Sequence, residues 1–285
     1  MRGRVLVVAG SDSGGGAGIQ ADIKAILAMG AHASTALTAL TAQNTLGVSG
    51  VRFVEPEFVR AQMVAVLSDI GADVVKTGML GRADTIQALL RTLDEQGPHI
   101  PLVVDPVMVA KGGARLLDDA AVAALVDGLL PRAALLTPNL PEAEALTGHA
   151  IADEAGMHQA IKRLRAMGGQ AVLLKGGHLP GPYVLDILAT QNGTETFRSA
   201  RIETRHTHGT GCTLASAIAA GMAQGMDLRA AVRRARAYVQ AAILGAPGLG
   251  AGHGPMGHDV TVDPDRLDWE APQSVVGASS RGLGR

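Results

Sequence analysis

Aromatic side chains are scarce in this sequence, because Phe, Trp and Tyr together supply only 2% of its 285 residues. Apolar residues nevertheless make up 47% of the chain, so a core must be built from Ala, Val, Leu and Ile. Such small and branched side chains suit helices that pack closely on both faces of a parallel sheet. The length and the composition together predict a large α/β core.

Cysteine and excess charge are scarce as well. The single cysteine, Cys212, excludes an intrachain disulfide and a structural zinc cluster, which favours a reducing compartment. With 25 basic and 26 acidic residues the formal net charge is −1, so no general attraction to nucleic acid or to an anionic membrane is expected. The opening segment lacks the features of a signal peptide, and no run of about 18 apolar residues is present. We therefore expect a cytoplasmic protein whose partner is a small molecule, not nucleic acid or a membrane.

The two common nucleotide-binding fingerprints are also missing. No G-x-x-x-x-G-K-[ST] occurs, and residues 10–18 do not satisfy G-x-G-x-x-G. P-loop and dinucleotide-binding sites are therefore disfavoured. A phosphate site in this chain must be built from a glycine turn at a helix start, helped by a lysine at a strand end.

Short aliphatic runs alternate along the chain with segments of helical spacing. Strands are predicted at residues 5–8, 73–79, 102–107, 134–137 and 171–174. Helices are predicted at residues 17–29, 59–70, 86–93, 122–130 and near 161–164. This alternation indicates right-handed crossovers and hence a doubly wound, mostly parallel sheet with helices on both faces.

The chain after residue 180 departs from this alternation. Residues 183–189 and 194–202 flank Gln191-Asn192-Gly193, a typical hairpin turn, and predict a small antiparallel edge on the sheet. Two Ala-rich helices are predicted next, near residues 213–226 and 228–244.

Polar and glycine-rich segments follow the predicted strands. They lie at residues 10–18, 76–81, 105–113, 137–142 and 175–178. Because the carboxyl ends of parallel strands meet at one edge of a sheet, we expect these segments to converge on a ligand site. The alternative is that each supplies only the Gly, Asp and Asn that turns require.

A glycine turn lies between the predicted hairpin and a long apolar helix, in His206-Thr207-His208-Gly209-Thr210-Gly211-Cys212-Thr213. Gly209 and Gly211 permit a tight turn, so the main-chain nitrogens of residues 210–212 can point into one concavity at the helix start. Such an anion hole suits the charge on a phosphoryl group during transfer. The helix dipole favours a Cys212 thiolate, which could accept a proton from a substrate hydroxyl. The alternative for Cys212 is a small buried residue that packs the helix start.

Side chains at other strand ends are candidates for phosphate and metal binding. Lys175 follows a strand-like run and can supply a point charge to a phosphate. Asn139 and Glu142 open a predicted helix and offer oxygen ligands to Mg²⁺, with Asp105 as a second acidic group. The alternatives are an ordinary solvated lysine, and helix capping with first-turn dipole compensation.

Gln43 is the candidate for recognition of a heteroaromatic ring. It lies in Thr41-Ala42-Gln43-Asn44-Thr45, after an apolar stretch that predicts the second strand. Its carboxamide both donates and accepts, so it can match the mixed edge of an aminopyrimidine. The alternative is a turn glutamine that faces water.

Several short segments, taken together and in order, resemble the bacterial hydroxymethylpyrimidine/phosphomethylpyrimidine kinases of the ribokinase-like superfamily. They are residues 9–22 (AGSDSGGGAGIQAD), 41–45 (TAQNT), 76–81 (KTGMLG), 105–108 (DPVM), 137–139 (TPN), 175–178 (KGGH), 209–213 (GTGCT) and 252–255 (GHGP). The resemblance implies a single ribokinase-like kinase domain over residues 1–258. We expect the C-terminal extension, residues 259–285, to be partly mobile.

The resemblance also implies an activity and a set of roles. The activity is ATP-dependent phosphorylation of 4-amino-5-hydroxymethyl-2-methylpyrimidine and then of its monophosphate, which gives the diphosphate used in thiamin synthesis. Recognition of the pyrimidine falls to Gln43, with a pocket shaped by Gly10, Ala17, Asp22, Met79 and Val107. ATP and Mg²⁺ fall to Asn139, Glu142 and Lys175, to which we add Thr213 for ATP and Asp105 for the metal. Catalysis falls to Lys175 and to Gly209, Thr210, Gly211 and Cys212, where many ribokinase-like sugar kinases carry an aspartate base. The family also implies a homodimer.

Three other functions stay open. A pyridoxal or pyridoxine kinase is the nearest, because vitamin kinases of this fold share the glycine turn and the cysteine, although Gln43 and Met79 favour the pyrimidine. A sugar kinase is disfavoured, because the aspartate of the last turn and an obvious lid insertion are missing. A non-catalytic ligand-binding module could reuse the pocket, but the intact phosphate-site residues argue against it.

Overall fold

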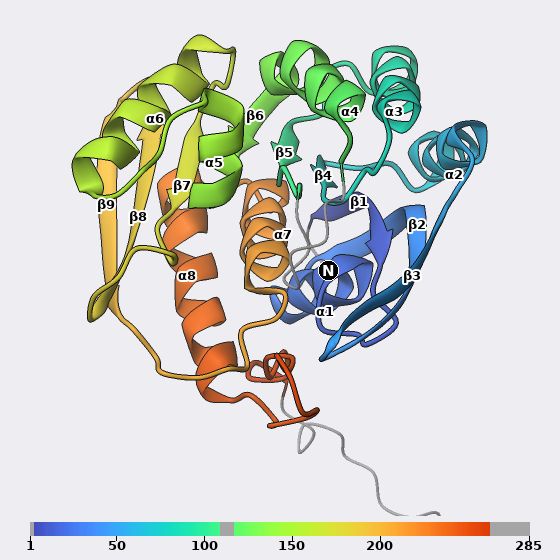
Figure 1. The fold of residues 1–285 in the computed structure, drawn as a ribbon. Coiled ribbons are helices and arrows are strands. Elements are labelled where there is room, and N and C mark those ends of the chain that lie inside the picture. Colours follow the sequence, from blue (N-terminus) through green and yellow to red (C-terminus); the bar gives the residue numbers. More distant parts are fainter. Residues whose placement is uncertain (1–2, 109–116, 263–285) are drawn as a thin grey trace, which may run out of the picture.

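The computed structural model describes residues 3–108 and 117–262. A nine-stranded sheet with the order β3-β2-β1-β4-β5-β6-β7-β8-β9 forms its centre, and helices cover both faces (Figure 1). Most of the predicted C-terminal extension, from residue 263 on, lies outside the described residues, as does part of the loop 105–113. The strands are β1 (Arg4–Ser11), β2 (His32–Asn44), β3 (Gly47–Phe53), β4 (Val74–Thr77), β5 (Leu102–Val104), β6 (Ala133–Leu136), β7 (Val172–Lys175), β8 (Tyr183–Thr190) and β9 (Gly193–Ala200).

The sheet is mostly parallel, as predicted. From β2 to β7 in the sheet order every neighbouring pair runs parallel, and the hairpin β8–β9 forms the predicted antiparallel edge. A second antiparallel pair, β2–β3, lies at the opposite edge and was not predicted. Its strands are joined by the two-residue turn Thr45-Leu46, which carries none of the Asn or Gly residues that mark such a hairpin in a sequence.

Successive residues of the central strands face opposite helical layers, because side chains alternate along a strand. In β1, Val5 and Val7 belong to the apolar cluster that packs against α1 (Gly18–Ala28), α7 (Thr210–Ala223) and α8 (Leu228–Leu244). Leu6 and Val8 belong to the cluster on the other face. That face is covered by α2 (Pro56–Asp69), α3 (Ala83–Gln96), α4 (Asp119–Ala124), α5 (Leu140–Thr147) and α6 (Glu154–Ala166).

The helix predicted over residues 122–130 is present in an irregular form. After α4 the chain continues through a π-helical turn, η1 (Leu125–Leu129), and a 3₁₀ turn, η2 (Leu130–Arg132). Pro131 lies in η2, where its missing amide hydrogen prevents a regular helical bond. Throughout residues 3–108 and 117–262, no helix combines the length and the apolar character needed to cross a membrane.

Candidate active site

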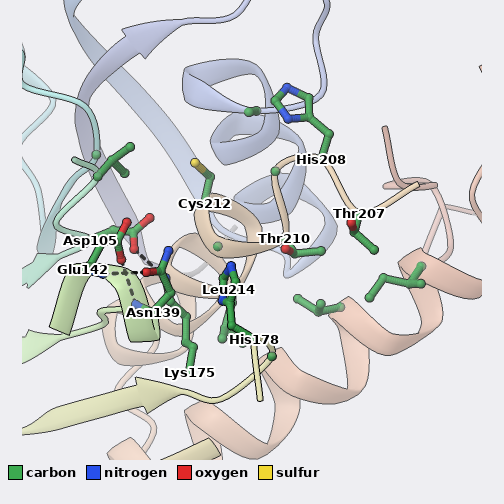
Figure 2. A pocket seen from close by; sticks show the side chains of 18 of the residues that line it. Asp105, Asn139, Glu142, Lys175, His178, Thr207, His208, Thr210, Cys212 and Leu214 are labelled. Carbon is green, nitrogen blue, oxygen red and sulfur yellow. Dashed lines mark hydrogen bonds and ion pairs between the residues drawn. The ribbon is translucent and has the colours of Figure 1, made fainter. Parts of the chain in front are cut away.

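A cavity of about 820 Å³ opens at the carboxyl ends of the parallel strands. Residues from all five predicted loops line it, so the expected convergence of these loops is confirmed. Figure 2 shows Lys175, Asp105 and Glu142 on one side of the start of α7 and His208 on the other. The predicted site residues that line the cavity are Gly10, Ala17, Gln43, Met79, Asp105, Val107, Asn139, Glu142, Lys175, Gly209, Thr210, Gly211 and Cys212.

The start of α7 presents free main-chain amides to this cavity. Gly209 is the N-cap residue, so no side chain caps the helix. Within the described ranges, the amide nitrogens of Gly211 and Cys212 donate to no acceptor, and that of Thr210 makes only a long 3.4 Å bond to the carbonyl of Thr207. Unsatisfied amides at a helix N-terminus attract anions. These amides therefore have the arrangement that the sequence predicted for an anion hole.

Gly209 is required by the close approach of two loops. Its φ of 83° lies in the left-handed region, and a Cβ there would collide with the carbonyl oxygen of Gly16. The loop after β1 is therefore held directly against the start of α7. Only glycine at position 209 permits this wall of the cavity to close.

Lys175, at the end of β7, reaches Asp105 at the end of β5, with 2.8 Å between Nζ and Oδ1. Thr137 Oγ1 donates to the same oxygen over 3.1 Å. Burial alone would raise the pKa of Asp105, but the positive charges of Lys175 and Lys76 prevail and lower it. A Cβ on Gly211 would lie 3.2 Å from Lys175 Nζ, so the ammonium lies beside the free amides. Lys175 is thus an ion-paired lysine of the cavity rather than a solvated one.

Asn139 and Glu142 form a capping box at the start of α5. Asn139 Oδ1 accepts the amide hydrogen of Glu142 over 2.9 Å, and Glu142 Oε2 accepts that of Asn139 over 2.7 Å. The capping alternative is therefore realised, yet both residues also line the cavity. Burial raises the pKa of Glu142 to about 7, and the charge of Asp105 acts in the same direction against that of Lys175.

The surroundings of Cys212 disfavour the thiolate that the sequence suggested. The surrounding protein atoms raise the pKa of the thiol to about 12, because burial outweighs the opposing charge of Lys76. The carboxylates of Asp22 and Asp105 raise the pKa further. The helix start is too weak to overcome these effects. Cys212 is accordingly a neutral thiol, which is a poor proton acceptor.

Two predicted site residues do not reach the cavity. Asp22 is fully buried, and its Oδ1 accepts from Lys76 Nζ and from Ser216 Oγ, each over 2.7 Å. Thr213 is also fully buried, with its Oγ1 3.0 Å from His258 Nε2. Direct contact of Asp22 with a substrate or of Thr213 with ATP does not fit these positions. Both residues instead support the start of α7 from behind.

Asp12 and His208 line the cavity and were missed from the sequence. The Asp12 carboxylate accepts main-chain hydrogens from Gly14, Gly16 and Ala17 over 2.8, 3.1 and 2.8 Å, and its Oδ2 lies 2.9 Å from His208 Nε2. Burial alone would raise the pKa of Asp12, but these hydrogen bonds prevail and lower it. The available signal was an aspartate among Ser and Gly, which is typical of a side chain that organises its own turn.

The wall near Gly10 is apolar. A Cβ on Gly10 would lie 3.3 Å from the sulfur of Met79, so glycine lets the thioether lie close to the backbone of β1. The carbonyl of Met79 accepts a hydrogen bond from Thr38 Oγ1 over 2.6 Å, which holds this loop in place. A polarizable sulfur on a backbone wall suits the face of a flat ring.

The cavity offers carboxylates for a magnesium ion without a closed metal cage. Among the residues that the structure describes, no three His, Cys, Asp or Glu side chains gather as metal ligands. Asp105 and Glu142 lie next to each other at the cavity (Figure 2), and the bonds described above occupy one oxygen of each. Mg²⁺ keeps several waters and takes one or two carboxylates together with phosphate oxygens. The remaining carboxylate oxygens fit that requirement.

Comparison with known proteins indicates one family. The profile of the family described as Phosphomethylpyrimidine kinase matches residues 12–257. A Hydroxymethylpyrimidine/phosphomethylpyrimidine kinase from Rhizobium meliloti is 50% identical over 256 residues, which cover 89% of this chain and 96% of that protein. The Thiamine biosynthesis bifunctional protein ThiED from Geobacter sulfurreducens is 55% identical over 265 residues, or 93% of this chain. The match spans only 54% of that longer relative.

Solved structures confirm the predicted ribokinase-like fold. A phosphomethylpyrimidine kinase from Clostridium difficile has a TM-score of 0.74 and 38% identity, and the match covers 83% of this chain and 97% of that one. A pyridoxal kinase from Bacillus subtilis, solved as an ADP complex, has a TM-score of 0.83 and 34% identity, over 91% of this chain and 98% of that one. The fold is therefore shared with two kinds of vitamin kinase.

Proposed function

The chain belongs to the phosphomethylpyrimidine kinase family, and from that premise we propose that it phosphorylates 4-amino-5-hydroxymethyl-2-methylpyrimidine and then its monophosphate, with ATP as donor. Family membership makes the chain a phosphotransferase. The first acceptor is an alcohol and the second is a phosphate, so the reacting oxygen changes while the ring stays the same. The protein must therefore hold the ring by one set of groups and the moving phosphoryl group by another.

The observation that carries this proposal is the position of Lys175 beside the free amides of Gly211 and Cys212. An ammonium and two N–H donors meet at the wall of the cavity, where they can stabilise charge on a phosphoryl group. Phosphoryl transfer asks the protein for positioning and electrostatic stabilisation more than for covalent chemistry. Donors that are already in place before the reaction supply both.

Asn139, Glu142 and Asp105 are the groups that would serve ATP and Mg²⁺. When bound, Mg²⁺ neutralises charge on phosphate oxygens and holds them in position. Glu142 is a carboxyl that burial makes hard to ionise, with a pKa raised to about 7. A neighbouring cation favours its charged form, so this carboxyl is suited to a cation site.

Gln43 and the wall formed by Gly10 and Met79 support recognition of the ring. Gln43 lines the same cavity as the anion hole and supplies a carboxamide that both donates and accepts. The amino group and ring nitrogen of an aminopyrimidine form an edge with one donor beside one acceptor. A carboxamide can pair with both at once.

The neutral Cys212 thiol bears on which group accepts the proton of the substrate's hydroxyl. A thiol whose pKa is raised to about 12 does not remove a proton at neutral pH. The thiol sulfur can still contact the reacting oxygen at the start of α7. We propose that Cys212 shapes this position and that the proton leaves with the developing phosphate.

A kinase assay with purified protein tests the proposal. With ATP and Mg²⁺ we expect phosphorylation of the aminopyrimidine alcohol and then of its monophosphate, detected by mass spectrometry, at a kcat/KM well above that for pyridoxal. Lys175→Met is the matched control, since its unbranched side chain is only one atom shorter and removes the charge beside the anion hole. A preference for pyridoxal would reassign the substrate, and binding without turnover would favour a ligand-binding module.

The homodimer and the cytoplasmic location stay predictions. Support for a dimer comes from the sheet edge at β3, because an unpaired edge strand is a ready site for association. Exposed apolar side chains, Leu40, Leu46 and Phe53, lie on the β2–β3 pair. Light scattering of the purified chain, and of a Leu46→Glu variant, measures the oligomeric state directly.

A further inference from the structure

Ser13 holds the main chain of Gln43 in place. The pairing of β2 with β3 shifts register at this point, since Ala42 lies opposite Gly50 and Gln43 lies opposite Val48. Ser13 Oγ accepts the amide hydrogen of Gln43 over 2.8 Å and donates to its carbonyl over 2.7 Å. The remaining freedom of Gln43 therefore lies in its side chain, and mainly in which end of the carboxamide faces the cavity.

One ring nitrogen of His208, Nε2, lies close to two other groups. Its Nε2 lies 2.9 Å from Asp12 Oδ2 and 3.2 Å from the carboxamide nitrogen of Gln43. The Asp12 carboxylate is ionised and can only accept, so Nε2 of His208 carries a hydrogen whether the ring is neutral or protonated. A hydrogen-bearing Nε2 cannot accept from the Gln43 amide. These two nitrogens would then be donors facing each other.

Thr41 resolves this conflict from the other end of the carboxamide. Its Oγ1 donates to the carbonyl of Ser11 over 2.9 Å and lies 3.2 Å from Gln43 Oε1. The hydroxyl has one hydrogen, so after donating to Ser11 it is an acceptor toward Gln43. Turning the carboxamide by half a turn places its NH₂ group against Thr41 and its oxygen against His208. The single Nε2 hydrogen of His208 is then shared between Asp12 Oδ2 and the Gln43 oxygen, and no two donors face each other.

We propose that His208, held by Asp12, is a positioning residue that fixes the orientation of the Gln43 carboxamide and thereby selects an aminopyrimidine. One N–H and one oxygen lone pair of Gln43 are left for the ligand in the cavity. They match the ring nitrogen and the amino group of the substrate. The inference deepens the proposed function and rests on it for the identity of the ligand.

Glycine at position 16 supports this role for His208. A Cβ on Gly16 would lie 2.7 Å from Cδ2 of the imidazole, so a larger residue would displace the ring from Asp12. The glycine loop after β1 thus does two tasks, because Asp12 holds the imidazole and Ser13 holds the backbone of Gln43. The loop after β1, which forms one wall of the cavity, therefore also fixes the position of Gln43, the residue proposed to recognise the substrate.

A fixed Gln43 carboxamide determines which ligand is preferred more than how tightly ligands bind in general. A site built to pair with a donor and an acceptor rejects ligands that lack one of them, because a buried polar group is then left without a partner. An unfixed carboxamide could instead turn to suit either kind of ligand. Removing the His208 contact should therefore weaken binding of the aminopyrimidine more than that of an analogue without the amino group.

The test crosses two variants, His208→Phe and His208→Gln, with two ligands. The ligands are the aminopyrimidine alcohol and 5-hydroxymethyl-2-methylpyrimidine, which lacks the amino group. For His208→Phe we expect KM for the aminopyrimidine to rise about tenfold and KM for the analogue to change less than about twofold. KM for ATP should stay unchanged. His208→Gln should restore selectivity, because its NH₂ group has two hydrogens and can donate both to Asp12 and to the Gln43 oxygen.

Calorimetric titration of both ligands without ATP keeps this test independent of phosphoryl transfer. If the wild-type protein fails to phosphorylate the aminopyrimidine, the proposed function is wrong, while the ratio of the two dissociation constants still tests His208. An equal loss for both ligands in His208→Phe would mean a merely structural role and overturn the inference. In a Gln43→Ala background, His208→Phe should have no further effect on that ratio, and a further loss would equally overturn it.

Discussion

Lys76 Nζ lies 2.7 Å from Asp22 Oδ1, and both side chains are fully buried. Ser216 of α7 donates to the same oxygen of Asp22, and it follows Cys212 by four residues, which places both on one face of the helix. The ion pair therefore lies behind the anion hole. Apolar replacements of buried ion pairs are often as stable as the pair itself, so stability alone does not explain it. We expect the charges of Lys76 and Asp22 to contribute to phosphoryl transfer at the anion hole.

Neutralising this pair separates its roles in stability and activity. Lys76→Met should lower the free energy of unfolding by about 3–5 kcal/mol, because it leaves Asp22 buried without its cation. The double variant Lys76→Met/Asp22→Leu should recover most of that loss in urea denaturation. We expect the double variant to be stable but to transfer phosphate at least about tenfold more slowly, because the charges of Lys76 and Asp22 contribute to catalysis. Full activity in the stable double variant would show that the pair is dispensable for the reaction.

The neutral state of Cys212 is measurable because the chain has one cysteine. Burial raises the pKa of this thiol to about 12, so alkylation by iodoacetamide should be slow at pH 8 and still rising above pH 10. Asp22→Asn should speed alkylation and Lys76→Met should slow it, because Asp22 raises and Lys76 lowers the pKa of the thiol. A general loosening of the fold would instead speed alkylation in both variants. A rate that levels off near pH 8.5 in the wild type would show an ordinary thiol.

The sequence was enough to predict the sheet where strands are buried on both faces. Val5 to Val8 are continuously apolar because successive side chains enter two different cores, and that pattern is visible in the sequence. The β2–β3 pair was missed because Thr45-Leu46 lacks turn residues and because an edge strand need not be continuously apolar. The hairpin could not be predicted, because its two turn residues are not typical of hairpin turns.

The site was predicted in part, for a related physical reason. Strand ends of a parallel sheet meet at one edge, so the loops that contain Lys175, Asn139 and Asp105 could be brought together from topology alone. Where a side chain points within its loop depends on tertiary contacts. Asp22 turns away from the cavity because Lys76, distant in sequence, meets it inside the core. The protonation state of Cys212 depends on the same surroundings.

Gly211 offers a substitution that closes the anion hole without straining the backbone. Its φ is not in the left-handed region, and a Cβ there would enter the space 3.2 Å from Lys175 Nζ. Gly211→Ala should therefore lower kcat at least about tenfold and leave the free energy of unfolding nearly unchanged, since alanine is the better helix former. Gly225→Ala is the control, because its φ of 80° makes alanine strained while no atom lies within 4 Å of the new Cβ. It should lose about 1 kcal/mol of stability and keep its activity.

His258 links the stability of the region behind the anion hole to pH. Burial, with a smaller effect of Lys24, lowers the pKa of His258 to about 4 from its ordinary 6.5. The unfolded chain therefore binds a proton between pH 6.5 and 4 that the folded chain excludes, so the contribution of His258 to stability is complete above pH 6.5 and is lost as the pH drops toward 4.

The loss from His258 should be on the order of 3 kcal/mol across this window, measured by urea denaturation at several pH values. His258→Gln keeps a group that can bond to Thr213 Oγ1 but cannot take up the proton, so its stability should be flatter over the same range. The lowered pKa of Asp12 affects stability only at still lower pH, and the raised pKa of Glu142 adds stability as the pH falls, equally in the variant and the wild type. Equal slopes for the variant and the wild type between pH 6.5 and 4 would therefore place the titrating group elsewhere. A flatter variant would show that the contact behind the start of α7 requires a neutral imidazole.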